Sequence, residues 1–499
     1  MINKLLVANR GEIACRIFRA ARELGISTVA VYSEADRDAM HPKFADESVE
    51  IGPPEAKDSY LNIDRIIDAA KKAGADAIHP GYGFLSERAE FAERVIAEGL
   101  VFVGPPAVAM RRLGAKIDAK RLAVEQNVPV TPGYFEPGAT TDKLKKEAKK
   151  IGYPVMLKAS AGGGGRGMRV VREEGDFERE CRLASEEAEK AFGDGAMMVE
   201  KLIERPRHIE VQVLADHHGN VACLYERECS IQRRHQKVIE EAPSPYMTDE
   251  LWQKMRKAAM KLVLASGYQN AGTIEFMVDS ASGEFYFLEV NARLQVEHPV
   301  TEMVTGIDLV QWQLKIASGE ELNLPEPVLK GDRSALRGHA IEARIISEDP
   351  AKGFLPSVGE IVAWAEPLDP TARVDTGFGQ GGEVTRFYDS LLAKLIVFGE
   401  DRSAAVRKMQ CALEDFHVLG VKTNIEYVLA VVSSEGFAKG DIDTGYLGRE
   451  FADWQPGDDV PKELADILRS AKTQGDARDY ADVPTSPAWD AADGFRVAR

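Results

Sequence analysis

Residues 272–299 constrain this chain more than any other stretch, because they combine a hairpin pattern with a dense group of polar side chains. Apolar and polar residues alternate in GTIEFMVD and again in EFYFLEV, which predicts two strands joined by a three-residue loop at 281–283. In that register Glu275 lies directly opposite Glu289. The other face is expected to enter the core and consists of Ile274, Phe276, Val278, Tyr286, Leu288 and Val290.

Paired carboxylates on one face of a hairpin favour a cation site. Directly opposed side chains lie roughly 5 Å apart, where like charges destabilise the strand pair. Glu275, Glu289 and, two residues on, Asn291 offer hard oxygen ligands suited to Mg²⁺, or Mn²⁺, that carries a phosphate. A solvated edge hairpin with basic neighbours is the alternative that the pair by itself leaves open.

The residues after the hairpin favour the cation site over that alternative. Arg293, Gln295, Glu297 and His298 follow one another closely. A guanidinium fork and an amide suit a small planar oxyanion, and a nearby glutamate could accept a proton from it. The pattern therefore indicates an oxyanion site beside the metal.

Composition limits the class of protein. A chain of 499 residues exceeds what one hydrophobic core supports, so two or three domains are expected. The net charge of −17 argues against nucleic acid or an anionic membrane as the main partner. The chain shows no run of about 20 apolar residues and no signal-like N-terminus. Its five cysteines lack CxxC spacing and indicate reduced packing residues, so a cytoplasmic location is expected.

The N-terminal region alternates strands and helices. Residues 4–33 have the pattern of a strand, a turn, a helix and a second strand, and the alternation continues through 63–104. This predicts an open, doubly wound α/β domain. A dinucleotide fingerprint would need G-x-G-x-x-G at the first turn, and only Gly11 is present, so a nicotinamide site is rejected.

Residues 154–171, PVMLKASAGGGGRGMRVV, hold a second strong signal. Glycines let backbone N–H groups close on phosphate oxygens. A Walker A loop would end in Gly-Lys-Ser/Thr and open a helix, whereas here Lys158 precedes the glycines and a strand follows. A glycine-rich hairpin between strands suits a mobile flap over a nucleotide, and a flexible linker is the alternative.

Further polar clusters follow this loop. Residues 200–202 form a connector whose backbone edge could read an adenine amino group. Residues 232–237 are basic within an acidic chain, which favours anion binding over a solvated face. After a proline-containing boundary at 322–332 the chain is rich in strand patterns, and Arg344 is expected on an exposed or cleft face.

The order and spacing of these motifs carry a family resemblance over residues 2–450. The chain resembles biotin carboxylase, the ATP-grasp component of biotin-dependent carboxylases, in NRGEIACRI, HPGYGFLSE, KASAGGGGRGM, EKLIERPRHIEVQVLAD, CSIQRRHQKVIEEAP, FLEVNARLQVEHPVTE, GHAIEARI and FYDSLLAKLIVFG. The resemblance implies that ATP phosphorylates bicarbonate to carboxyphosphate, which breaks down to carbon dioxide and phosphate. The phosphate then deprotonates biotin, and the biotin enolate captures carbon dioxide.

The resemblance also implies a role for each matching residue. Glu297 would deprotonate bicarbonate, Arg344 would stabilise the biotin enolate, and the hairpin residues would bind the metal. The bicarbonate and phosphate contacts would come from Lys237, Arg293, Gln295 and the Val296 backbone. The ATP phosphate contacts would come from Lys116, Lys158, Gly163, Gly164 and His235, and those to adenine and ribose from Glu200, Leu202, His208 and Gln232.

The implied fold combines α/β and α+β domains. A Rossmann-like domain over 1–112 would precede an ATP-grasp domain over 113–330, whose mobile glycine-rich lid covers about 131–203. A strand-rich α+β domain over 331–450 and a polar tail or linker over 451–499 would follow. The departures from the family pattern remove no reacting group and are Ala115, Arg88 and Ala292, where the family usually has Asp, Asn and Thr.

The implied reaction needs biotin on a carrier. The family's acceptor lysine lies in an Ala-Met-Lys-Met hairpin tip, and the nearest match, 259–262, falls in a predicted helix. The carrier is therefore expected on another chain or a further segment, alongside a homodimer of the carboxylase region and a carboxyltransferase subunit. The ending SPAWDAADGFRV resembles the linker of the biotin-bearing subunit of acyl-CoA carboxylases.

Two other functions remain open. One is a different ATP-grasp ligase, of the carbamoyl-phosphate or purine-pathway kind, which would not need biotin. The other is a nucleotide-binding regulatory subunit that has lost a reacting group, although Glu297, Arg293, Lys237 and Arg344 are all present.

Overall fold

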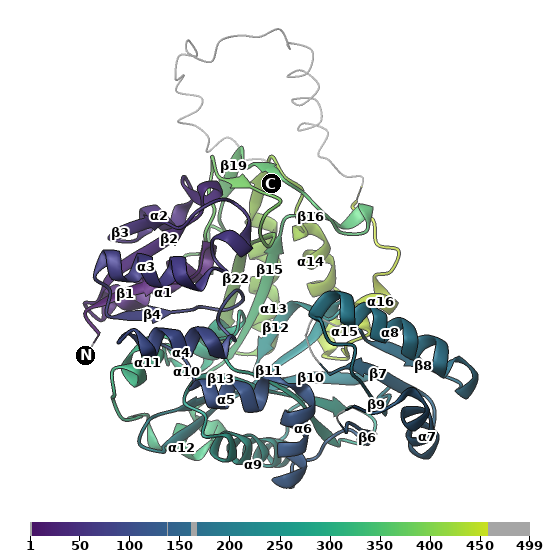
Figure 1. Cartoon of the computed structure of the whole chain (residues 1–499). Coiled ribbons are helices and arrows are strands. Elements are labelled where there is room, and N and C mark those ends of the chain that lie inside the picture. The colour runs from purple at the N-terminus through teal and green to yellow at the C-terminus, as the bar shows by residue number, and fades with distance from the viewer. Residues whose placement is uncertain (1, 137, 161–166, 458–499) are drawn as a thin grey trace. The chain divides into compact units, whose positions relative to one another are not determined.

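The computed structural model describes residues 2–136, 138–160 and 167–457, and one compact unit spans Met1–Trp454 (Figure 1). The expected tail beyond residue 457 lies outside the described residues. None of the described helices combines the length and the apolar character needed to cross a bilayer. Four of the five cysteines are buried and unpaired, as expected, whereas Cys411 is exposed.

The N-terminal region has the doubly wound α/β fold that the alternation predicts. Its five parallel strands lie in the order β3-β2-β1-β4-β5 (Figure 1, purple and blue). Helices pack on both faces, which explains why the central strands are apolar almost throughout. The bounds are β1 Lys4–Val7, α1 Gly11–Glu23, β2 Ser27–Tyr32, α2 Met40–Phe44, β3 Glu47–Glu50, α3 Ile63–Ala73, β4 Ala77–His79, α4 Ala89–Ala97 and β5 Val101–Phe102.

A long antiparallel sheet connects the remaining regions, with its strands in the order β14-β13-β10-β11-β12-β15-β22-β20. Glu240 on β12 pairs with Glu342 on β15, so the sheet continues across the domain boundary expected at residue 330. That boundary therefore lies in a connection between strands of one sheet. The bounds are β10 Pro206–Ala215, β11 Val221–Arg233, β12 Gln236–Ala242, β13 Asn270–Asp279, β14 Phe285–Asn291, β15 His339–Ile346, β20 Arg373–Thr376 and β22 Leu391–Gly399.

Strands β13 and β14 form the predicted hairpin with a different loop. Glu275 lies opposite Glu289, as expected. Toward the loop the register shifts by one residue, which places Phe276 opposite Phe287. The loop spans 280–284, longer than predicted, and the β-bulge restores the expected pairing of the two carboxylates.

Because of the bulge, the residues of β14 that enter the core differ from those that the sequence predicted. Phe285 and Phe287 are buried, whereas Tyr286 and Leu288, which the sequence predicted for the core, are half-buried. A one-residue slip turns side chains to the opposite face of a sheet, which explains the exchange. Beyond the bulge Val290 is buried as predicted.

A smaller antiparallel sheet, in the order β6-β9-β7-β8, has its own apolar core beneath two helices. Because β7 and β8 pair, the glycine-rich segment joins neighbouring strands, as the flap hypothesis requires. Residues 161–166, with Gly163 and Gly164, lie outside the described residues. The bounds are β6 Gly133–Tyr134, α7 Thr141–Ile151, β7 Val155–Ala159, β8 Arg169–Val171, α8 Phe177–Phe192 and β9 Met197–Lys201.

Other helices cover the long sheet, and α13 and α14 pack over β15 and β22 around a second large core. The helices are α5 Ala107–Gly114, α6 Lys116–Glu125, α9 Asp249–Ser266, α10 His298–Thr305, α11 Leu309–Ala317, α12 Glu326–Lys330, α13 Arg402–Asp415, α14 Ile425–Val432, α15 Glu435–Lys439 and α16 Tyr446–Glu450. Short strand pairs are β16 Glu348–Asp349 with β17 Leu355–Pro356, β18 Gly359–Glu360 with β21 Glu383–Val384, and β19 Ala363–Ala365 with β23 His417–Leu419.

The bulge makes a testable difference between neighbouring residues. Phe287→Ala should lower the free energy of unfolding by about 3–5 kcal/mol, because it removes a fully buried ring. Leu288→Ala, on the other face, should cost clearly less, because Leu288 is half-buried and lines the cavity. Urea unfolding followed by tryptophan fluorescence measures both, and a larger loss at Leu288 would contradict the observed register.

Candidate functional site

A cavity of about 1060 Å³ lies where the N-terminal sheet, the small sheet and the long sheet meet. Nearly all of the described residues that were predicted to form the site line this cavity. Glu297 is buried and contacts two of the lining residues, Lys237 and Arg344. The lining includes Lys116, Lys158, Glu200, Leu202, His208, Gln232, His235, Lys237, Glu275, Glu289, Asn291, Arg293, Gln295, Val296 and Arg344.

Glu297 directly precedes α10, and two cations share its carboxylate. Oε1 accepts a hydrogen bond from Lys237 Nζ at 2.5 Å, and Oε2 accepts one from Arg344 Nη2 at 2.9 Å. Burial opposes ionisation of this carboxyl, yet Lys237 and Arg344 hold the pKa of Glu297 well below its usual range. Glu297 is therefore a weak base until one of the two cations moves away.

The ammonium of Lys237 joins three carboxylates that belong to different elements. It donates to Glu210 at 2.6 Å, Glu275 at 2.9 Å and Glu297 at 2.5 Å. The other carboxylate oxygen of Glu210, Oε1, accepts a hydrogen bond from Arg227 Nε at 2.6 Å. Lys237 therefore links Glu275, an expected metal ligand, to Glu297, the expected base.

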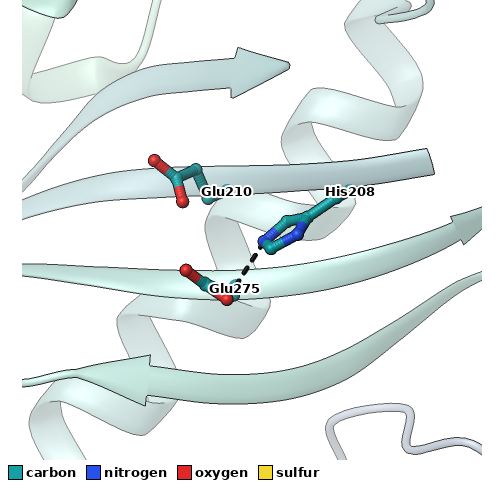
Figure 2. A group of neighbouring side chains, drawn as sticks. All are labelled: His208, Glu210 and Glu275. Atoms are coloured by element: carbon teal, nitrogen blue, oxygen red, sulfur yellow. Dashed lines mark ion pairs between the residues drawn. The ribbon is translucent and has the colours of Figure 1, made fainter. Parts of the chain in front are cut away.

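Figure 2 shows His208, Glu210 and Glu275 on the neighbouring strands β10 and β13, with the imidazole turned toward Glu275. His208 Nε2 lies 3.0 Å from Glu275 Oε2. Burial opposes protonation of the ring, but Glu275 outweighs it and raises the pKa of His208. In this structure His208 thus contacts an expected metal ligand, and its contact with adenine or ribose stays a prediction.

Two of the three expected metal ligands, Glu275 and Glu289, offer carboxylate oxygens that suit a hard cation. Burial opposes ionisation of Glu275, but Lys237 outweighs it and lowers the pKa of this carboxyl. Glu289 lies opposite on β14 and is partly exposed to the cavity. Asn291 turns its amide nitrogen to Glu275 at 2.8 Å and its oxygen to Arg293 at 3.0 Å, so its amide would have to flip to offer oxygen to a metal.

Arg293 and Gln295, the residues expected to hold an oxyanion, are in direct contact with each other. Arg293 Nη1 donates to Gln295 Oε1 at 2.7 Å, and Gln295 Nε2 donates to Glu275 at 3.2 Å. Arg293 Nε donates to Glu87 at 3.1 Å. Glu87 was not predicted as a site residue, although it is the last residue of the HPGYGFLSE motif, which could have indicated it.

The part of the cavity expected to hold the nucleotide contains a lysine, Lys120, that was not predicted from the sequence. Fully buried Glu200 has Lys158 Nζ 2.7 Å from one carboxylate oxygen and Lys120 in contact with the other. Burial opposes ionisation of Glu200, yet Lys120 and Lys158 lower its pKa to about 2. Lys120 follows Lys116 by one helical turn on α6, and this spacing is the signal that could have revealed it.

The connector expected to read adenine is already paired through its N–H groups. Lys201 and Leu202 donate to the carbonyl oxygens of Pro132 and Pro154, at 2.8 and 3.2 Å. Because an adenine amino group is a donor, it would have to meet a carbonyl oxygen here.

Two departures from the family pattern lie at helix N-caps. Ala115 precedes α6 and Arg88 precedes α4, and neither side chain caps its helix. The Asp and Asn usual in the family are favoured N-caps, each worth about 1 kcal/mol. Lys116 therefore starts its helix without side-chain support from the preceding residue.

Family models match most of the chain. The biotin carboxylase N-terminal domain matches residues 1–110, and the biotin carboxylase C-terminal domain matches residues 342–449. Between them, the ATP-binding domain of the carbamoyl-phosphate synthase L chain matches residues 115–325.

The chain is 51% identical over 449 residues to the alpha subunit of mitochondrial methylcrotonoyl-CoA carboxylase from Oryza sativa subsp. japonica. That match covers 90% of this chain and 60% of the relative, so the chain spans about three-fifths of its length. The chain is also 50% identical over 447 residues to a pyruvate carboxylase subunit from Methanothermobacter thermautotrophicus, with 90% of each covered.

Solved structures agree with these matches. The biotin carboxylase–βγ-ATP complex from Campylobacter jejuni has a TM-score of 0.86 and 46% identity, covering 90% of this chain and 99% of that one. The biotin carboxylase domain dimer of Hydrogenobacter thermophilus 2-oxoglutarate carboxylase, in complex with MgADP, ADP and bicarbonate, has a TM-score of 0.87 and 45% identity. It covers 92% of this chain and 100% of that one.

Proposed function

The chain belongs to the biotin carboxylase family, the ATP-grasp component of biotin-dependent carboxylases, and we propose how its residues divide the first half-reaction between them. The observation that carries the proposal is the carboxylate of Glu297, held between Lys237 and Arg344. Lys237 belongs to the group around the expected metal ligands, whereas Arg344 lies on β15. Glu297 therefore contacts one residue from each of the two proposed reaction steps, formation of carboxyphosphate and carboxylation of biotin.

Carboxyphosphate would form on the Lys237 side. Arg293 and Gln295 hold bicarbonate, and Lys237 leaves Glu297 for the arriving phosphate and bicarbonate charges. Glu297, free of one cation, accepts the bicarbonate proton. A bicarbonate oxygen then attacks the γ-phosphorus, and ADP leaves.

Glu275 and Glu289 would hold Mg²⁺ or Mn²⁺, joined by Asn291 once its amide turns. The bound ion would neutralise and orient the ATP phosphates. Lys116, Lys158, His235 and the glycine-rich segment with Gly163 and Gly164 would hold the phosphates, and Glu200, Leu202, His208 and Gln232 would surround adenine and ribose.

Biotin would react on the Arg344 side. Carboxyphosphate breaks into carbon dioxide and phosphate, and the phosphate takes the proton from the biotin ureido nitrogen. Arg344 stabilises the enolate oxygen while that nitrogen forms a bond to the carbon of carbon dioxide. Arg344 also donates from Nε to Glu240 at 2.7 Å, so Glu240 and Glu297 together orient its guanidinium.

The partners belong to the same proposal. The biotin carrier would lie on another chain or a further segment, the carboxyltransferase would be a separate subunit, and the carboxylase region would pair as a homodimer, like the Hydrogenobacter domain dimer. The acceptor is an acyl-CoA or a keto acid such as pyruvate, because the relatives named above are subunits of methylcrotonoyl-CoA carboxylase and of pyruvate carboxylase. A cytoplasmic location stays a prediction.

One assay tests the proposed reaction directly. ADP formation should depend on bicarbonate and increase with free biotin. A carbamoyl-phosphate type of ligase would instead respond to ammonia, and a regulatory subunit would release no ADP.

Glu297→Gln should lower bicarbonate-dependent turnover by about 10²-fold or more, because the amide cannot accept a proton. ADP release at saturating bicarbonate measures the loss. Turnover near that of the parent would show that Glu297 is not the base.

Glu289→Gln should raise the Mg²⁺ concentration needed for half-maximal turnover, because a neutral amide replaces an anionic hard ligand. Glu275→Gln should do the same and also release Lys237 and His208 from their shared carboxylate. Mg²⁺ titrations of ADP release compare the variants, and a parent-like titration would assign a structural role to that glutamate.

Arg344→Ala should abolish most biotin carboxylation while a slow bicarbonate-dependent ATPase remains. Removing one donor aimed at a developing oxyanion costs roughly 3–4 kcal/mol. Arg344→Lys should rescue only part, because a point charge does not reproduce the planar fork. The paired measurement is ADP release without biotin and carboxybiotin formation with it, and equal loss of both would refute the division of roles.

A further inference from the structure

Lys394 on β22 is fully buried, and its ammonium contacts the oxyanion loop, residues 293–297. Nζ donates to the carbonyl oxygen of Val296 at 3.0 Å. The same nitrogen lies 3.2 Å from Glu12 Oε2 and 3.8 Å from Asp375 Oδ2. A buried ammonium needs such partners to offset its lost hydration, and one of these partners is the backbone of the oxyanion loop.

The long sheet places Lys394 directly opposite Arg344 on the neighbouring strand. Arg344 binds the carboxylate of Glu297, and Lys394 binds the carbonyl of the preceding residue, Val296. Two cations from adjacent strands thus hold two consecutive residues of the loop, one through its side chain and one through its backbone.

A histidine restrains the same loop at the preceding peptide. His298 Nδ1 lies 2.7 Å from the carbonyl oxygen of Gln295. Because a carbonyl oxygen only accepts hydrogen bonds, Nδ1 carries the hydrogen in this contact, and burial lowers the pKa of His298 well below its usual value. Because N–H and C=O of a trans peptide point in opposite directions, drawing back the Gln295 carbonyl turns the N–H of Val296 away from His298.

Glu12 connects Lys394 to the N-terminal domain. Glu12 lies on α1, and its Oε1 accepts a hydrogen bond from the hydroxyl of Tyr82. Tyr82 lines the cavity in the loop that follows β4. A continuous series of contacts therefore runs from Tyr82 through Glu12 and Lys394 to Val296.

We propose that Lys394 is a positioning residue for bicarbonate: with Glu12 and Tyr82 it forms a buried strut that fixes the Val296 peptide beside Glu297. The inference rests on the proposed bicarbonate site at 293–297. The strut acts on bicarbonate and not on ATP, since the lysines expected to bind ATP phosphates lie on α6 and β7.

Lys394→Met tests the strut in the biotin-independent ADP-release assay. The KM for bicarbonate should rise about tenfold or more, the size expected when one charged hydrogen bond that supports its site is lost, while the KM for ATP changes less than about twofold. Lys394→Arg, which keeps a donor, should restore part of the bicarbonate KM. Equal changes in both KM values would overturn the proposal.

A double variant separates positioning from charge balance. Lys394→Met leaves Glu12 without its cation, whereas Lys394→Met/Glu12→Gln removes both charges. The double variant should regain thermal stability, measured as Tm without ligands, yet keep the raised bicarbonate KM. A parent-like KM would mean that Lys394 only neutralises Glu12, and this result also decides the question if the single variant does not fold.

Two further variants complete the comparison. Arg373→Met removes a cation from the same buried cluster, where Arg373 pairs with Glu302 and Asp375 but not with the loop. It should lower Tm and leave the bicarbonate KM unchanged.

Arg293→Met probes the bicarbonate site itself. If it raises the bicarbonate KM and Lys394→Met does not, the proposed strut is wrong and the proposed bicarbonate site is retained. If neither variant raises it, the proposed bicarbonate site is wrong as well.

Discussion

The ammonium of Lys237 between three carboxylates is the contact on which the whole site depends. Glu210, Glu275 and Glu297 approach it at 2.6, 2.9 and 2.5 Å. Three buried carboxylates this close would repel one another strongly in a low-dielectric interior, and the cation among them offsets that repulsion. A substrate that draws Lys237 away would therefore change the basicity of Glu297 and the charge around Glu275 at the same time.

The long sheet and one helix explain how the proposed base, Glu297, comes to lie beside Arg344. Glu297 follows β14 at one end of the sheet, whereas Arg344 lies on β15, far along the strand order. Helix α10 closes this distance, because its Val300 and Val304 pack against Ala340 and Ile396 on β15 and β22. Apolar packing of one short helix thus brings Glu297 to Arg344. Lys394, which lies opposite Arg344 on β22, contacts Val296, the residue before Glu297.

Local patterns were sufficient for much of the fold and for part of the site. Alternation predicted the N-terminal sheet and its helices, and it paired Glu275 with Glu289 correctly. That pairing was reached through a loop that was too short, and the β-bulge compensated for the difference. A bulge is decided by how two strands pack together, so the positions of Tyr286 and Leu288 could not be predicted from alternation.

The sequence by itself determined which candidate reacting groups are present and in what order, because motif residues and strand periodicity are local properties of the chain. The tertiary structure alone decided what those groups contact. Lys120 meets Glu200, His208 turns to Glu275, and Arg344 bridges Glu240 and Glu297, all across long stretches of sequence. The ionisation of a buried group depends on its burial and on the charges that folding brings beside it, and no local pattern encodes either.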